Sequence, residues 1–203
     1  MKIKRVEKVQ VARLPSEFPG EDLPEVAVGG RSNVGKSSFL NALLRVRGLS
    51  TVSRTPGRTR ALGFFRVNQE FHLVDLPGYG YAAVPRKVQE KWGQLVEEYL
   101  QRRIQLRGMI LLLDLRHAPA PPDVQLSAAL AEMGLSLLLV GTKADKVPRG
   151  RRRHHLDIIR RALPLPQDAA PICFSARTGE GREDVLQALE RLVKAPPRTS
   201  PLS

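Results

Sequence analysis

Four residues near position 30 have the types and the spacing of a phosphate-binding loop. In the stretch VAVGGRSNVGKSS, Gly30, Gly35, Lys36 and Ser37 follow the pattern G-x-x-x-x-G-K-S. Glycines at these positions let backbone amides turn inward onto phosphate oxygens, the lysine neutralises the outer phosphates, and the serine hydroxyl can coordinate Mg²⁺. The pattern therefore predicts a nucleotide-binding loop. Its expected members are Gly30, Arg31, Ser32, Asn33, Val34, Gly35, Lys36, Ser37 and Ser38.

A second segment could select the base. The stretch LLLVGTKAD places Thr142, Lys143, Ala144 and Asp145 at the end of an apolar run. A carboxylate there can accept two hydrogen bonds from the N1 and N2 nitrogens of guanine, whereas adenine lacks that pair of donors and would leave Asp145 unpaired. A polar turn after a strand is the alternative interpretation. The phosphate loop upstream favours guanine.

A further segment, CFSARTG, follows the last apolar run of the chain. Its position about 30 residues after Asp145, just before the last expected helix, indicates that Phe174, Ser175 and Ala176 adjoin the base. The backbone amides of Ser175 and Ala176 could bind the guanine oxygen.

The stretch VDLPGYGYA could sense the terminal phosphate. Asp75 ends an apolar strand, from which its carboxylate would reach Mg²⁺ through water, and the amide of Gly78 could hydrogen-bond the γ-phosphate. We therefore expect Asp75, Leu76, Pro77 and Gly78 to contact the nucleotide. Tyr79 stands where a hydrolase of this kind often carries a glutamine that orients the attacking water.

The stretch STVSRTPGRTRA lacks periodicity and is predicted to be a loop. A threonine in it should reach Mg²⁺ and the γ-phosphate only in the triphosphate state, and its release after hydrolysis would change the shape of the loop. Thr59 is the first choice and Thr55 the second, with Gly57 and Arg58 beside the nucleotide. The expected catalytic residues are Lys36, Thr59 and Gly78, and the expected direct Mg²⁺ ligands are Ser37 and Thr59.

Short apolar runs that alternate with stretches of helical period must position these segments. The predicted strands are residues 25–28, 63–67, 71–74, 109–113, 135–140 and 171–174, and the predicted helices are 36–45, 86–103, 123–133, 150–162 and 183–193. This alternation predicts an α/β fold with a mostly parallel sheet covered on both faces. Only residues 63–67 and 71–74 are close enough along the chain to form an antiparallel hairpin.

The composition favours a polyanionic partner. The chain has 203 residues, with 33 Lys and Arg against 20 Asp and Glu, a formal net charge of +13. Clusters of basic residues, including RGRRRHH near residue 150, could bind RNA phosphates or could simply be a solvated face. Arg151, Arg152 and Arg153 are expected to point outward. One cysteine, no secretory leader and no apolar run of membrane-spanning length predict a soluble cytoplasmic protein without a membrane partner.

The motifs GRSNVGKSS, TPGRT, DLPGYGYA, TKAD and FSARTG, in this order, resemble the EngB family of bacterial GTPases, in the Era-like branch. The resemblance covers about residues 24–193 of one expected domain, leaving a basic segment 1–20 and a Pro/Ser-rich tail 195–203. It implies a three-layer Ras-like domain with a six-stranded sheet and one antiparallel strand. This domain would bind GTP or GDP with Mg²⁺, and the protein would be a monomer. It also implies a role in assembling the large ribosomal subunit through rRNA, and a link to cell division and septation. TKAD departs from the commoner form, which has asparagine at position 142.

The resemblance bears on catalysis as well. Enzymes of this branch lack the steering glutamine and hydrolyse GTP slowly, so Tyr79 is expected not to be catalytic. Asn33 occupies the position at which related K⁺-activated GTPases place an asparagine that binds the ion. The alternative is that Asn33 only hydrogen-bonds the loop. LLLDLRHAP also resembles a family feature, although Asp114 and Arg116 could be ordinary polar residues at a strand end.

Two other functions are consistent with the sequence. A P-loop ATPase or small-molecule kinase would need a lid and an acceptor pocket, for which the sequence shows no segment, and Asp145 argues against adenine. An RNA- or ribosome-binding module with a structural nucleotide would also explain the basic surface.

Overall fold

A computed structural model describes residues 1–46, 48, 61–79, 86–164 and 170–197, with the backbone alone for residues 86–92. The strands are β1 (Val6–Ala12), β2 (Glu25–Gly30), β3 (Leu62–Val67), β4 (Phe71–Asp75), β5 (Leu106–Asp114), β6 (Ser136–Thr142) and β7 (Ile172–Cys173). The helices are α1 (Lys36–Leu44), α2 (Arg86–Arg102), α3 (Pro121–Glu132), α4 (Arg149–Ala162) and α5 (Arg182–Val193), with short 3₁₀ turns η1 (Pro15–Glu17) and η2 (Ala144–Lys146).

All strands of the described chain belong to one sheet, in the order β1-β3-β4-β2-β5-β6-β7. β2, β4, β5, β6 and β7 pair in parallel, and β3 pairs antiparallel with both β4 and β1. The predicted mostly parallel sheet, with β3 as its antiparallel strand and the β3–β4 hairpin, is therefore confirmed. The sheet has one strand more than the six predicted, because part of the basic N-terminal segment forms the edge strand β1.

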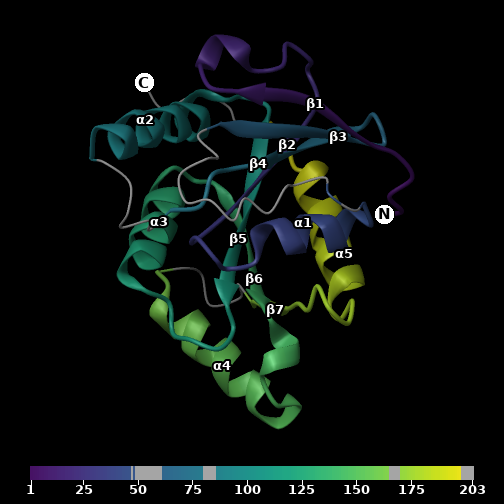
Figure 1. The fold of residues 1–203 in the computed structure, drawn as a ribbon, viewed down its shortest axis with the longest axis vertical. Helices are drawn as coiled ribbons and strands as arrows, with labels where there is room; N and C mark the ends of the chain where they lie inside the picture. The colour runs from purple at the N-terminus through teal and green to yellow at the C-terminus, as the bar shows by residue number, and fades with distance from the viewer. Residues whose placement is uncertain (47, 49–60, 80–85, 165–169, 198–203) are drawn as a thin grey trace.

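Helices cover both faces of the sheet and give three layers (Figure 1). Phe39, Leu40 and Leu43 of α1 pack with Leu186 and Leu189 of α5 in a buried cluster on one face. The cluster on the other face contains buried side chains from α2, α3 and α4 and from the residue that follows α4; these are Leu95, Tyr99, Leu100, Leu130, Ile159 and Leu163. The two apolar layers fix the sheet in the middle of the fold.

The carboxyl ends of the parallel strands meet at one edge of the sheet, which is where open α/β sheets bind ligands. The segments that follow β2, β4, β5 and β6 are those that begin at Arg31, Leu76, Leu115 and Lys143. The topology thus brings the phosphate loop, the DLPG segment and the TKAD segment to one edge. No helix among the described residues is long and apolar enough to cross a bilayer.

Candidate functional site

The loop between β2 and α1 has the backbone of a phosphate-binding loop. β2 ends at Gly30, two residues beyond the predicted end of the strand, and α1 begins at Lys36, as the sequence predicted. Asn33 has a φ of 67° and Gly35 a φ of 100°, so the chain turns sharply before the helix, and residue 35 needs the freedom of glycine. The first amides of α1 then lack partners within the helix and, with the helix dipole, favour an anion.

Lys36 and Asp75 meet in this loop. The ammonium group of Lys36 forms an ion pair with Oδ1 of Asp75, at the end of β4, and both side chains are almost buried. The sequence assigned these residues to the outer phosphates and to Mg²⁺, and the structure places them in contact. Ser37 follows Lys36 at the start of α1. A hydroxyl and a carboxylate are oxygen donors of the kind that Mg²⁺ prefers, so this set fits the metal.

Thr142 connects the TKAD segment to the phosphate loop. Its buried hydroxyl lies 2.7 Å from the carbonyl oxygen of Val34 and 3.1 Å from that of Leu113, so its single hydrogen is shared between these two acceptors, with the shorter contact to Val34. Threonine therefore serves at this position as a donor that joins two strand ends and the loop. The departure from asparagine keeps a hydrogen bond to the loop.

Lys143 makes a second connection between the same segments. Its ammonium group donates to the carbonyl oxygen of Asn33 at 2.7 Å and to Oδ2 of Asp114 at 2.9 Å. Partial burial raises the pKa of Asp114, but the hydrogen bonds from Arg116 and Lys143 outweigh it and hold this pKa well below its usual range. Asp114 is thus a charged residue that positions Lys143, a role that the strand-end pattern alone did not reveal.

Asp145 is oriented by the segment that precedes α5. The hydroxyl of Ser175 donates to Oδ1 of Asp145 at 2.8 Å, and the amide of Ala144 donates to the carbonyl of Phe174 at 3.1 Å. The amide of Ser175, however, donates to the carbonyl of Glu180 at 3.1 Å. The amide of Ser175 thus closes its own loop in this structure, whereas its hydroxyl faces Asp145; the expectation that Ser175 and Ala176 offer amides to guanine stays a prediction.

Phe174 has a packing role beneath the site. It is buried, and its ring lies 4.8 Å from the ring of Phe39, centroid to centroid, at an angle of 63°. This contact seats the strand end after β7 on α1, so that the loop beginning at Ser175 is fixed at its base.

Tyr79 is held against α3. Its hydroxyl donates to Oδ1 of Asp123 at 2.7 Å, while its carbonyl accepts the amide of Ser32 at 3.0 Å. Burial and the hydrogen bond to Asp123 raise the pKa of Tyr79 well above its usual value. Gly78, just before it, lies so close to Ser32 that a Cβ would be 3.2 Å from the amide nitrogen. The phenol is therefore occupied by a structural contact and remains protonated at neutral pH.

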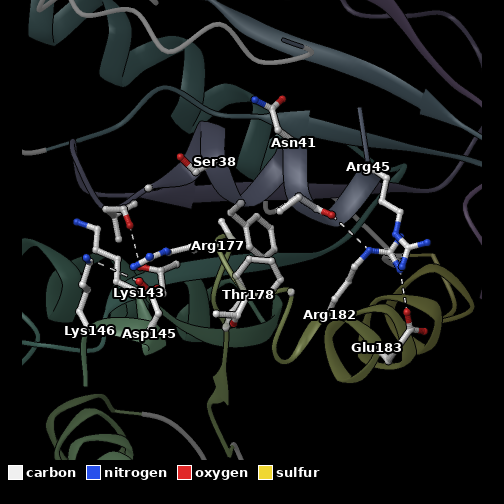
Figure 2. Close-up of a pocket in the computed structure, with 18 of the residues that line it drawn as sticks. Ser38, Asn41, Arg45, Lys143, Asp145, Lys146, Arg177, Thr178, Arg182 and Glu183 are labelled. Atoms are coloured by element: carbon white, nitrogen blue, oxygen red, sulfur yellow. Dashed lines mark hydrogen bonds and ion pairs between the residues drawn. The ribbon is translucent and has the colours of Figure 1, made fainter. Parts of the chain in front are cut away.

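A cleft of about 920 Å³ lies between α1, the TKAD segment and the loop that follows Phe174, and Val34 and Gly35 of the phosphate loop also line it. Figure 2 shows Lys143, Asp145, Lys146 and Arg177 gathered at one end of it and Arg45, Arg182 and Glu183 at the other. Gly35, Ser38 and Ala176 are further lining residues. The volume lies in the range of small-molecule sites. Gly57, Arg58, Thr59 and the alternative Thr55 lie outside the described residues, so the structure leaves these predictions open.

The basic helix α4 differs from the expectation at one residue. Arg149, Arg151 and Arg153 are exposed, and none of them makes an ion pair within the described part of the chain. Arg152, in contrast, turns inward: its side chain is 13 % exposed, pairs with Glu180 and donates from Nε to the carbonyl of Val147 at 3.0 Å. The prediction that Arg152 points outward is wrong, because a buried acceptor and a carboxylate attract it to the inner face.

Comparisons with known proteins agree with this geometry. Residues 25–143 match the family model described as 50S ribosome-binding GTPase. The probable GTP-binding protein EngB of Heliobacterium modesticaldum is 47 % identical over 190 residues, which cover 94 % of this chain and 93 % of that protein.

Two solved structures share the fold. A crystal structure of a probable GTP-binding protein engB has a TM-score of 0.70 and 21 % identity over 84 % of this chain and 98 % of its own. Era in complex with MgGDPNP and nucleotides 1506–1542 of 16S ribosomal RNA has a TM-score of 0.65 and 22 % identity over 89 % of this chain and 59 % of its own.

Proposed function

The chain belongs to the EngB family of GTP-binding proteins, and from this premise we propose that it is a slow GTPase switch in assembly of the large ribosomal subunit. Membership of the family makes it a GTPase. The observation that carries the proposal is a single cleft in which the phosphate loop and Asp145 are joined through Thr142, Lys143 and Ser175. The cytoplasm is the compartment that this role requires.

Guanine would bind at the end of the cleft that contains Asp145. Ser175 holds one carboxylate oxygen of Asp145 at 2.8 Å, which fixes the direction in which the carboxylate can accept the N1 and N2 hydrogens of guanine. The stem of Lys143 would lie along the guanine ring, and the amide of Ala176 would donate to the guanine oxygen. A base without both donors would leave the carboxylate partly unpaired, which is the physical source of selectivity.

The phosphates would bind at the start of α1. The proposed binding set is the loop 30–38 with Asp75, Leu76, Pro77 and Gly78, and Lys36 would exchange its contact with Asp75 for the outer phosphates. Ser37 and Thr59, with Asp75 through water, would hold Mg²⁺, which when bound neutralises charge on the phosphates. In this scheme Lys36, Thr59 and Gly78 stabilise the transferred phosphoryl group.

Slow hydrolysis follows from the position of Tyr79. Its hydroxyl already donates a hydrogen bond to Asp123, so it is not a free donor for the attacking water. Because the pKa of Tyr79 is raised, the phenol also stays protonated and cannot act as a base. The water would be held by backbone groups of the loop that contains Thr59, completed when the protein binds its ribosomal partner. Ribosomal particles should therefore raise the turnover rate.

Calorimetry with GDP and GTP tests the base site. We expect Asp145→Asn to lose affinity for guanine nucleotides and to gain affinity for xanthosine diphosphate, because an amide can donate to the extra oxygen of xanthine. Wild-type protein that binds ATP as tightly as GTP would overturn the proposal. Protein that binds GTP but shows no hydrolysis in a single turnover on ribosomal particles would indicate a binding module instead.

The exposed arginines of α4 are the proposed contact for ribosomal RNA. Sedimentation with large ribosomal subunits should show weaker binding of the Arg151→Ala/Arg153→Ala variant, with a salt dependence reduced by about two charges. The matched control replaces Arg102 and Lys194, two exposed cations that already lie near glutamates. An unchanged salt slope in the α4 variant would remove α4 from the interface. Comparison of GTP-analogue, GDP and nucleotide-free states tests whether binding is switched.

Potassium is the proposed activating cation at Asn33. The carbonyl of Asn33 accepts Lys143, while its exposed side-chain amide makes no hydrogen bond within the described residues, so the loop-bonding alternative has no support there. Hydrolysis should be faster in KCl than in NaCl at equal ionic strength, and Asn33→Ala should abolish the difference. Equal rates in the two salts would end the proposal.

A further inference from the structure

Arg152 links α4 to two loops of the proposed guanine site. It lies in a helix whose neighbouring arginines 151 and 153 are exposed, yet only 13 % of its own side chain is exposed. Its Nε donates to the carbonyl of Val147 at 3.0 Å, and its Nη1 forms an ion pair with Glu180. One guanidinium therefore contacts two separate segments, through the carbonyl of Val147 and the carboxylate of Glu180, which are its two anchors.

The anchors belong to the two segments that would surround the base. Val147 directly follows the turn η2, which carries Asp145, and its amide donates to the carbonyl of Ala144 at 3.1 Å. Glu180 lies at the end of the loop that begins at Ser175, and its carbonyl accepts the amide of Ser175 at 3.1 Å. A displacement of either anchor would thus be transmitted to Asp145 or to its hydrogen-bond partner.

The loop 175–181 depends on polar contacts for its conformation. Residues 176–179 are all exposed, and Gly179 and Gly181 have positive φ angles of 78° and 77°. An exposed loop with few apolar contacts is held mainly by hydrogen bonds and ion pairs. The contacts of Ser175 fix the start of this loop, and the ion pair of Arg152 with Glu180 fixes its end.

We propose that Arg152 is a positioning residue that holds the two base-binding loops together and thereby sets the lifetime of the bound guanine nucleotide. Planar guanidinium groups suit such a role, because they present several donors in a fixed geometry. This inference rests on the proposed placement of guanine at Asp145. It assigns Arg152 a function apart from that of the exposed arginines on the same helix.

The test is the dissociation rate of a fluorescent GDP analogue, chased with excess GDP in a stopped-flow instrument. Arg152→Ala should release the nucleotide roughly tenfold faster, which corresponds to about 1.4 kcal/mol. Arg152→Lys and Glu180→Gln, which each keep part of the contact, should give intermediate rates. Arg102→Ala is the matched control, since it removes the same charge from an exposed side chain of α2 to which no binding role is assigned, and it should release GDP at the wild-type rate.

A second measurement separates positioning from general loss of stability. Inosine diphosphate lacks the N2 amino group, so the ratio of its affinity to that of GDP reports how well Asp145 is oriented. We expect this ratio to approach one in Arg152→Ala, whereas an overall loss of stability would lower the melting temperature and leave the ratio unchanged. Should Arg152→Ala not fold, Glu180→Gln gives the same readout from the other end of the ion pair.

Two outcomes would overturn the inference. One is release of GDP at the wild-type rate by Arg152→Ala, or by Glu180→Gln where the alanine variant does not fold. The other is an affinity ratio of inosine diphosphate to GDP that is unchanged from wild type. The variant Asp145→Asn distinguishes a failure of the proposed role of Arg152 from a failure of the proposed guanine site. If Asp145→Asn weakens GDP binding while Arg152→Ala does not, only the role of Arg152 is wrong. If neither variant affects GDP, the placement of guanine at Asp145 is wrong as well.

Discussion

Replacement of Thr142 by valine would test whether the base segment supports the phosphate loop. Valine has nearly the shape of threonine but no hydroxyl, so the change removes the donor that lies 2.7 Å from the carbonyl of Val34 and 3.1 Å from that of Leu113. Thr142 is 3 % exposed, and water cannot readily replace the lost donor. A buried polar group left unsatisfied costs about 1–3 kcal/mol.

This loss should appear both in stability and in nucleotide binding. A chain of this size should lose roughly 2–4 °C in melting temperature for each kcal/mol. The nucleotide-bound form needs the loop in one conformation, whereas the free protein can relax, so part of the loss should fall on affinity. If about 1 kcal/mol of the lost free energy appears as weaker nucleotide binding, GDP will dissociate about fivefold faster. Unfolding must be followed without nucleotide, because bound ligand raises the apparent stability.

Thr142→Asn is the matched control. The asparagine amide can donate two hydrogen bonds, so it should keep most of the stability and the slow release of GDP. Denaturant unfolding monitored by circular dichroism and stopped-flow release of fluorescent GDP measure the two effects. Valine and threonine forms that are equally stable and release GDP equally fast would refute the idea that this hydroxyl supports the loop.

Three further predictions concern other parts of the fold. Gly181→Ala should cost about 2–4 kcal/mol, because φ is 77° and a Cβ would lie 1.8 Å from the carbonyl oxygen of Cys173; an unchanged melting temperature would contradict this. Tyr79→Phe should keep the rate of GTP hydrolysis, and a fall of ~10²-fold would instead indicate acid–base participation. Burial raises the pKa of Glu25, but hydrogen bonds, including those from Arg103, outweigh it and hold this pKa below its usual value. Its contribution to stability is thus complete above the unfolded pKa and is lost as the pH falls through the lowered folded pKa, so Glu25→Gln should unfold with a weaker dependence on acid pH in denaturant titrations.

The elements that carry the site could be predicted from sequence because local patterns determine them. The G-x-x-x-x-G-K-S spacing located the turn between β2 and α1, and the helical period of α5 placed Val185, Leu186 and Leu189 in the core, where they are buried. Apolar periodicity and glycine positions are properties of a few neighbouring residues. They require no knowledge of what lies across the sheet.

The strand β1 was missed because its pattern is interrupted. The register of its pairing with β3 shifts between Lys8 and Gln10, so the alternation of inward and outward side chains breaks at Val9. Val6 packs against the cluster on the α1 and α5 face, whereas Ala12, six residues further on and therefore on the same face of an uninterrupted strand, lies in the cluster on the opposite face. A charged segment with such an irregularity resembles a basic tail until its partner strand is known.

The partners of Arg152 could not be predicted for a different reason. Its helical position shows that it lies near the stripe of Leu156 and Ile159, but Glu180 is 28 residues away in the sequence. A cation near an apolar stripe can bend outward to water or inward to an acceptor. The choice depends on the carbonyl of Val147 and on a carboxylate that only the folded chain brings to that face.

The contacts around the cleft differ in how easily they can open. The hydroxyl of Thr142 is buried between two carbonyls, and separating the base segment from the phosphate loop would leave these groups without water or protein partners. The carboxylate of Glu180, in contrast, is 38 % exposed, so water can solvate it as soon as its ion pair with Arg152 breaks. Opening therefore costs less at the loop 175–181 than at the phosphate loop. Release of the nucleotide should begin at the base, and substitutions at the ion pair should change the rate of GDP release more than they change the stability of the fold.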